Sequence, residues 1–117
     1  MARSVLIVDD HPSFRSSARM LLESEGYEVV GEAEDGHSAI ERARDLKPDF
    51  VLLDVHLPDI DGFAVAARLT ENGSSPAIVL VSSRPREDIE SLVDGSGARG
   101  FITKSELSGA ALEALLS

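Results

Sequence analysis

The chain has 117 residues, the size of one domain, and 43% of them are hydrophobic, which is enough to bury a substantial core. It contains no cysteine, so disulfides, thiolate metal sites and cysteine nucleophiles are excluded. A net charge of -10 opposes direct contact with nucleic acid, and no apolar stretch approaches the roughly 20 residues that span a bilayer, so we expect a cytoplasmic domain without membrane contact.

Short apolar runs alternate with helical patterns from the N-terminus onward. The run Val5–Val8 predicts a first strand, and Pro12 after it suits the first turn of a helix that ends at Gly26. We then expect a second strand over 27–31 and a second helix from about 36 to 45.

The middle of the chain continues the alternation. The run Phe50–Asp54 is nearly all apolar, which is typical of a strand covered on both faces. Asp61 is predicted to cap the next helix, which leads to a turn over 72–76. Ala77–Val81 then predicts a fourth buried strand.

The last third predicts one more strand between two helices. A short acidic helix passes through 89–93, the fifth strand lies around 101–102, and the last helix starts near Ser105. Five strands alternating with five helices predict an α/β fold, a doubly wound sandwich of three layers with a mostly parallel sheet.

Charged side chains follow three of the predicted strands. Asp9 and Asp10 close the first strand, Asp54 closes the third, and Lys104 follows the fifth. The carboxyl ends of parallel strands meet at one sheet edge, so we expect these four side chains in one pocket. Three carboxylates and one ammonium leave excess negative charge, which favours a hard divalent cation such as Mg²⁺.

This set of residues can support phosphoryl transfer. The Asp54 carboxylate can attack phosphorus and form an aspartyl phosphate. Asp10 and Asp54 would ligate Mg²⁺ directly, together with a backbone carbonyl just after Asp54, while Asp9 would act through water. Lys104 would hold the phosphate as a point charge. Ser82 would donate a hydroxyl hydrogen bond, with its neighbour Ser83 as the alternative; we prefer Ser82 because it directly ends the fourth strand.

In their order along the chain, these residues resemble the receiver domain of bacterial two-component response regulators. The resemblance rests on Asp9-Asp10, on Asp54 followed by 57–62, on Ser82, and on 101–104. It covers the whole chain, residues 1–117. It implies a flavodoxin-like (βα)5 fold with sheet order 2-1-3-4-5, Mg²⁺ or Mn²⁺ as cofactor, and phosphorylation of Asp54 by a sensor histidine kinase.

The resemblance also implies how phosphorylation changes the conformation of the domain. His56 would supply the backbone carbonyl to the metal, and Ser82 and Phe101 would be the switch residues. An aromatic residue in a strand usually packs inward, so an ordinary core role for Phe101 stays open beside the switch role. Phosphorylation would remodel the face made by the fourth helix, the fifth strand and the fifth helix. The side chains of His56 and Arg84 would tune the access of water to the phosphoryl group. Such a domain is no enzyme beyond its own phosphoryl transfer and slow autodephosphorylation.

Two segments resemble the branch of response regulators that has a LuxR-type helix-turn-helix output, namely 10–15 and 104–107. The chain ends with the fifth helix, so we expect either a free-standing receiver or the N-terminal part of a transcription factor. We favour the second, with a DNA-binding output domain outside this chain, and allow for a homodimer on phosphorylation. Ser105 stands where the common receiver pattern has proline, so we expect a trans Lys104–Ser105 bond and a locally different loop.

Three other functions fit the sequence less well. A receiver-like interaction module that works without phosphorylation would normally have lost one of the pocket residues. A haloacid-dehalogenase-like phosphohydrolase needs a second aspartate two residues after the nucleophile, where this chain has His56. A flavin-binding domain would need a serine- and glycine-rich phosphate loop after the first strand, where this chain has residues 9–12.

The remaining polar residues near the pocket are interpreted as structural. Nothing in the spacing of His11, His37 and His56 brings them to one face, so we expect them at the surface. Asp59 and Asp61 are interpreted as loop and cap residues rather than ligands.

Overall fold

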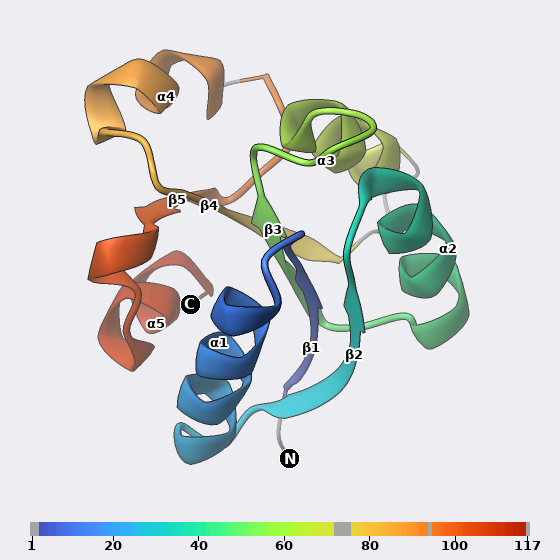
Figure 1. Ribbon diagram of the computed structural model, residues 1–117, viewed down its shortest axis with the longest axis vertical. Coiled ribbons are helices and arrows are strands. Elements are labelled where there is room, and N and C mark those ends of the chain that lie inside the picture. Colours follow the sequence, from blue (N-terminus) through green and yellow to red (C-terminus); the bar gives the residue numbers. More distant parts are fainter. Residues whose placement is uncertain (1–2, 72–75, 94, 117) are drawn as a thin grey trace.

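The fold is one parallel sheet with helices on both faces (Figure 1). A computed structural model describes residues 3–71, 76–93 and 95–116. The strand order is β2-β1-β3-β4-β5, which confirms the predicted fold class and sheet order. The strands are β1 (Ser4–Val8), β2 (Glu28–Ala33), β3 (Phe50–Asp54), β4 (Ala77–Ser82) and β5 (Gly100–Thr103).

Five helices of the described residues form the two outer layers. They are α1 (Pro12–Ser24), α2 (Gly36–Leu46), α3 (Gly62–Thr70), α4 (Arg86–Val93) and α5 (Gly109–Leu116), with a short 3-10 helix at Lys104–Glu106. The buried residues of α1 and α5 share one core with the sheet, and those of α2, α3 and α4 share the core on its other face. None of the described helices is long and apolar enough to cross a bilayer.

The central position of β3 in the sheet explains why its sequence is almost entirely apolar. Along β3, Phe50 and Leu52 enter the core beneath α1 and α5, whereas Val51 and Leu53 enter the core beneath α2, α3 and α4. Successive side chains of a strand point to opposite faces, so a strand covered on both sides is apolar throughout.

Local signals set most helix ends. Pro12 occupies the first turn of α1, and Gly26 follows the end of that helix with φ +90°. The Asp35 carboxylate accepts from the backbone N–H of Ser38 at 2.8 Å at the start of α2. Asp61 accepts from the N–H of Ala64 at 2.9 Å, which confirms the predicted cap of α3.

Two predicted boundaries were wrong. The second strand runs over 28–33 rather than 27–31, because it pairs with the whole of β1 as far as Val8. The last helix begins at Gly109 rather than near Ser105, since the chain first makes the 3-10 turn at Lys104–Glu106. The Lys104–Ser105 bond is trans as predicted, and the described residues contain no cis peptide. Residues 72–75 of the predicted turn lie outside the described residues.

The strand register brings the polar residues to one edge of the sheet. Asp54, the last residue of β3, lies opposite Val81 of β4. Ser82, the next residue, lies opposite Thr103 of β5, and Lys104 follows directly. Three neighbouring strands therefore end in an aspartate, a serine and a threonine followed by lysine.

Candidate functional site

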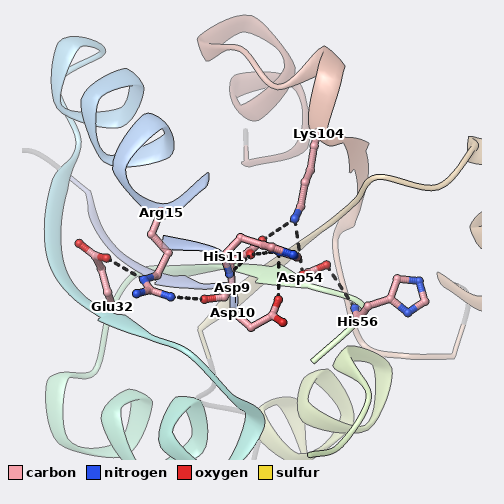
Figure 2. A network of polar contacts seen from close by, with 8 residues as sticks. All are labelled: Asp9, Asp10, His11, Arg15, Glu32, Asp54, His56 and Lys104. Atoms are coloured by element: carbon pink, nitrogen blue, oxygen red, sulfur yellow. Dashed lines mark hydrogen bonds and ion pairs between the residues drawn. The ribbon is translucent and has the colours of Figure 1, made fainter. Parts of the chain in front are cut away.

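A cluster of carboxylates lies at the carboxyl ends of β1 and β3 (Figure 2). Ligand atoms of Asp9, Asp10, His11 and Asp54 all lie within 4.8 Å of one another. Asp9 is fully buried and Asp54 is 2% exposed, whereas the Asp10 side chain is 35% exposed. We call these three carboxylates the acidic cup; its mouth opens on the Asp10 side.

Lys104 reaches into the acidic cup from the end of β5 (Figure 2). Its Nζ lies 2.7 Å from Oδ2 of Asp9 and 3.6 Å from Oδ2 of Asp54. The same Nζ lies 4.5 Å from the centroid of the Phe14 ring on α1. A cation over an aromatic face is attracted by the ring, so Phe14 helps to position the ammonium group. The sequence interpretation missed this role of Phe14.

The acidic cup carries more negative charge than Lys104 neutralises. Burial, and after it the charge of Asp9, raise the pKa of Asp54 from its ordinary value of 3.8 to about 6. The N–H of His56, 3.2 Å from Oδ1 of Asp54, and the charge of Lys104 act in the opposite direction. An additional cation would therefore lower the free energy of the ionised cup.

The donor set fits a hard divalent ion. Oδ2 of Asp9 is buried and accepts no aligned hydrogen bond from any described residue, so its ion pair with Lys104 is its main compensation. Carboxylate and carbonyl oxygens are the ligands that Mg²⁺ and Mn²⁺ prefer. The residues of the cup therefore fit the cofactor predicted from the sequence.

The end of β1 is held from the α1 side. Nη1 of Arg15 donates to the carbonyl of Asp9 at 2.7 Å, while its Nε donates to Glu32 of β2 at 3.0 Å. Arg19 also donates to Glu32, at 2.8 Å. Burial alone would raise the pKa of Glu32, but the hydrogen bonds and charges of Arg19 and Arg15 lower it. The spacing of the two arginines on α1 was the only sequence signal for this support.

Three predicted residues lie around the cup with different exposure. Ser82 is fully buried, and its Oγ accepts from the N–H of Arg84 at 3.0 Å, whereas its neighbour Ser83 is exposed. The side chains of Arg84 and His56 are exposed, and the His56 ring points away from the carboxylates in Figure 2. Only the backbone of His56 contacts Asp54.

Phe101 is buried in β5 beside the start of α4. The residue is 6% exposed and packs in the core shared with Ile89. Cζ of Arg86 lies 5.5 Å from the ring centroid, and Nη2 of Arg86 lies 3.7 Å from Glu106. The predicted switch residue thus lies where α4, β5 and the loop before α5 meet.

Asp59 connects the loop after β3 to α2. Its carboxylate accepts from the N–H groups of Gly36, His37 and Ile60, and from the His37 ring. Desolvation acts to raise the pKa of Asp59, but these hydrogen bonds hold it far below its usual range. The interpretation of Asp59 as a loop residue agrees with these contacts.

His11 differs from the prediction in its surroundings. Its side chain is 65% exposed, as expected, but Nδ1 lies 3.1 Å from an oxygen of Asp9 and 3.1 Å from one of Asp10. The spacing of the histidines along the chain carried no signal for this convergence.

A comparison with protein families decides what kind of domain this is. Residues 5–116 match the model of the response regulator receiver domain. The chain belongs to this family. The match supports neither a phosphohydrolase nor a flavin-binding domain, and the residue two after Asp54 is the exposed His56 rather than an acid.

Curated relatives of this receiver domain include transcription regulators. The virulence-factor transcription regulator BvgA of Bordetella pertussis is 39% identical over 106 residues, which are 91% of this chain and 51% of BvgA. The receiver domain thus spans about half the length of the curated relatives that it matches.

Solved structures of receiver domains superpose closely on this one. A LuxR-family response regulator from Aurantimonas sp. SI85-9A1 has a TM-score of 0.88 and 31% identity, over 99% of this chain and 86% of that one. A chain of the CheX–CheY–BeF3–Mg²⁺ complex from Borrelia burgdorferi has a TM-score of 0.82 and 25% identity, over 97% of this chain and 86% of that one.

Proposed function

We propose that this receiver domain accepts a phosphoryl group on Asp54 from the phosphohistidine of a sensor histidine kinase. The observation that carries the proposal is the position of Asp54. Its carboxylate ends the central strand, is 2% exposed, and lies between two further carboxylates and the ammonium group of Lys104. A nucleophile, an electrophilic partner for phosphate oxygens and a set of metal ligands therefore meet at one point.

The transfer needs few groups. An oxygen of Asp54 forms the new P–O bond as the P–N bond to the kinase histidine breaks, and the electron pair stays on the histidine nitrogen. Asp54 must be ionised to attack, and a pKa of about 6 leaves it mostly ionised at neutral pH. Lys104, 3.6 Å from Asp54 Oδ2, is placed to attract the phosphoryl oxygens.

The acidic cup would hold Mg²⁺ or Mn²⁺ through Asp10, Asp54 and the backbone carbonyl of His56, with Asp9 acting through water. When bound, the ion neutralises the cup and the charge that develops on the phosphoryl oxygens. The structure of the Borrelia complex with BeF3 and Mg²⁺ supports a magnesium site in a domain of this fold. Hydrolysis of the acyl phosphate within the same site would be slow, with His56 and Arg84 tuning the access of water.

Phosphorylation would then act as a switch. The new oxygens attract the Ser82 hydroxyl and Lys104, which draws the end of β4 toward the site. That movement favours the conformation in which Phe101 is held inward and in which the α4-β5-α5 face binds its partner. The phosphoryl group shifts the equilibrium between the two conformations of the domain only by interacting more favourably with one of them.

The whole protein is proposed to be a longer transcription regulator with residues 1–117 as its receiver domain. The chain spans about half of BvgA, and the curated relatives include transcription regulators. A LuxR-type helix-turn-helix domain outside this chain would contact DNA, because a net charge of -10 makes the receiver unsuited to that task. Such a regulator works in the cytoplasm, and its phosphorylated form is expected to dimerise.

The phosphoryl acceptor is tested by labelling with acetyl phosphate and Mg²⁺. We expect the wild-type chain to gain the mass of one phosphoryl group, and we expect Asp54→Asn to gain none. Asp45→Asn, which changes an exposed carboxylate on α2, is the matched control and should label normally. Undiminished labelling of Asp54→Asn would place the acceptor elsewhere.

A further inference from the structure

The backbone of His11 is held firmly at the mouth of the acidic cup. Its N–H donates to Oδ1 of Asp9 at 2.8 Å, and its carbonyl accepts from the N–H of Arg15 at 3.1 Å. Pro12 follows, and a residue before proline avoids the helical region, which agrees with φ -97° and ψ 111° at His11. The Cβ of His11 is therefore fixed relative to the carboxylates.

The imidazole leans over the cup, between Asp9 and Asp10 (Figure 2). Its Nδ1 is 3.1 Å from Oδ1 of Asp9 and 3.1 Å from Oδ1 of Asp10. Around a tetrahedral Zn²⁺ ion with ligands at about 2.0–2.1 Å, neighbouring ligand atoms are about 3.3 Å apart. Both nitrogen–oxygen distances are thus already close to the separation of two ligands of one such ion, and all the ligand atoms of the cluster lie within 4.8 Å of one another.

The two oxygens of Asp9 face different partners. Oδ2 is paired with Lys104 at 2.7 Å, so Oδ1 is the oxygen turned toward the imidazole. The other two histidines offer nothing comparable. The His37 ring contacts Asp59, and the His56 ring points away from the carboxylates.

An imidazole changes which ions a carboxylate site prefers. Mg²⁺ takes oxygen ligands and keeps several waters, so a ring nitrogen adds little to its binding. Zn²⁺, Ni²⁺ and Cu²⁺ bind imidazole well, and their affinity for sites that contain a ring nitrogen is higher than that of Mg²⁺. A histidine at the mouth of the cup therefore adds a ligand for this second class of ion.

We propose that His11 is a metal ligand of this receiver domain, so that its acidic cup binds borderline divalent ions of the Zn²⁺ class through Nδ1 of His11 with the carboxylates of Asp9, Asp10 and Asp54. This inference rests on the metal site of the proposed function, which it extends to a second class of ion. Mg²⁺ and the Zn²⁺-class ion share ligands, so they bind in competition.

The test measures metal binding directly, by calorimetric titration of the 117-residue chain with Mg²⁺ alone and with Zn²⁺ alone. We expect His11→Gln, which keeps a hydrogen-bond donor near the carboxylates, to lose Zn²⁺ affinity on the order of tenfold or more. Its Mg²⁺ affinity should stay within about twofold, since oxygens bind that ion. His37→Gln is the control and should keep the wild-type Zn²⁺ affinity.

A spectroscopic measurement identifies the ligand atom. Cu²⁺ bound to the wild-type chain should give an electron paramagnetic resonance spectrum with nitrogen coupling, which His11→Gln should lose and His37→Gln should keep. Equal Zn²⁺ affinity in wild type and His11→Gln, or nitrogen coupling retained in that variant, would overturn the proposal. Tighter Mg²⁺ binding by His11→Gln with unchanged Zn²⁺ binding would also overturn it, because the ring would then only obstruct the cup. Failure of the proposed magnesium site is a separate result, seen as absent Mg²⁺ binding in every variant.

Discussion

The ionisation of Asp54 is subject to two opposing physical effects. Asp54 must be ionised to attack phosphorus, yet burial and the charge of Asp9 raise its pKa to about 6. The chain keeps this unfavourable arrangement with one ammonium group, at 3.6 Å, as a partial compensation. This arrangement lowers the stability of the fold. For the same reason, the site gains free energy when it binds a cation and a phosphoryl group.

The pH dependence of stability should reveal this cost. The folded pKa of about 6 exceeds the ordinary value of 3.8, so the folded state holds the proton more tightly, and the contribution of Asp54 to stability falls as the pH rises from about 4 to about 6. Asp54→Asn cannot ionise, so at pH 7.5 it should be more stable than wild type by roughly 1–3 kcal/mol, and this gap should close near pH 4. Urea unfolding in EDTA at both pH values measures it.

The exposed carboxylate variant Asp45→Asn serves as the control, and its stability relative to wild type should not change with pH in this way. A gap between Asp54→Asn and wild type that is equal at both pH values would refute the electrostatic explanation.

At the scale of elements, the loop between β3 and α3 joins the acceptor strand to its surroundings. The N–H of Gly62 donates to the carbonyl of Val55 at 2.7 Å, which folds the loop back onto the end of β3. Asp59 attaches the same loop to the start of α2. The backbone around the proposed metal carbonyl is therefore fixed from two sides.

Gly62 is required by close packing at this loop. A Cβ at this position would lie 2.3 Å from the carbonyl oxygen of Asp54 and 2.7 Å from Cα of Val55, and both are backbone atoms. Gly62→Ala should therefore destabilise the domain by about 1–3 kcal/mol and weaken Mg²⁺ binding, because the chain beside Asp54 must move. Chemical denaturation and Mg²⁺ titration of the same variant test both effects.

Gly26→Ala separates steric from conformational effects. Gly26 has φ +90° but nothing within 4 Å of its added Cβ, so the variant should lose about 1–2 kcal/mol through backbone strain alone. Its Mg²⁺ affinity should remain that of wild type. If Gly62→Ala likewise kept full Mg²⁺ affinity, the loop would not position the metal ligands.

At the scale of the whole molecule, charge and architecture act together. The chain carries a net charge of -10, and the sheet order brings part of that charge to one edge. A cation bound there stabilises only the folded state, because the unfolded chain does not assemble the cup.

Mg²⁺ should therefore raise the thermal stability of the domain. At a concentration of ten times its dissociation constant, the ion should add about 1.4 kcal/mol to the free energy of unfolding. Scanning calorimetry in MgCl2 and in NaCl of equal ionic strength separates specific binding from screening of the net charge. Asp10→Asn should show the NaCl response only; an equal Mg²⁺ response in Asp10→Asn and wild type would argue against Asp10 as a ligand.

Much of the fold and part of the site could be predicted from local sequence. The apolar run of β3 and the helical spacing after Pro12 are local patterns, so the α/β class and most element bounds followed from them. The strand-end positions of Asp54 and Lys104 then placed both at one edge of a parallel sheet. The boundary at Ser105 was predicted wrongly because nothing nearby in the sequence separates a 3-10 turn from the first turn of a helix.

The sequence by itself determined the alternation of strands and helices and the charged residues at the strand ends, since period and strand length are properties of consecutive residues. Only the tertiary structure decided that Nδ1 of His11 meets two carboxylates, that Phe14 lies beneath the ammonium of Lys104, and that Glu32 anchors Arg15. Those contacts depend on how α1 is rotated against β1, β2 and β5. That rotation is set by packing between segments distant in the chain, which no local pattern encodes.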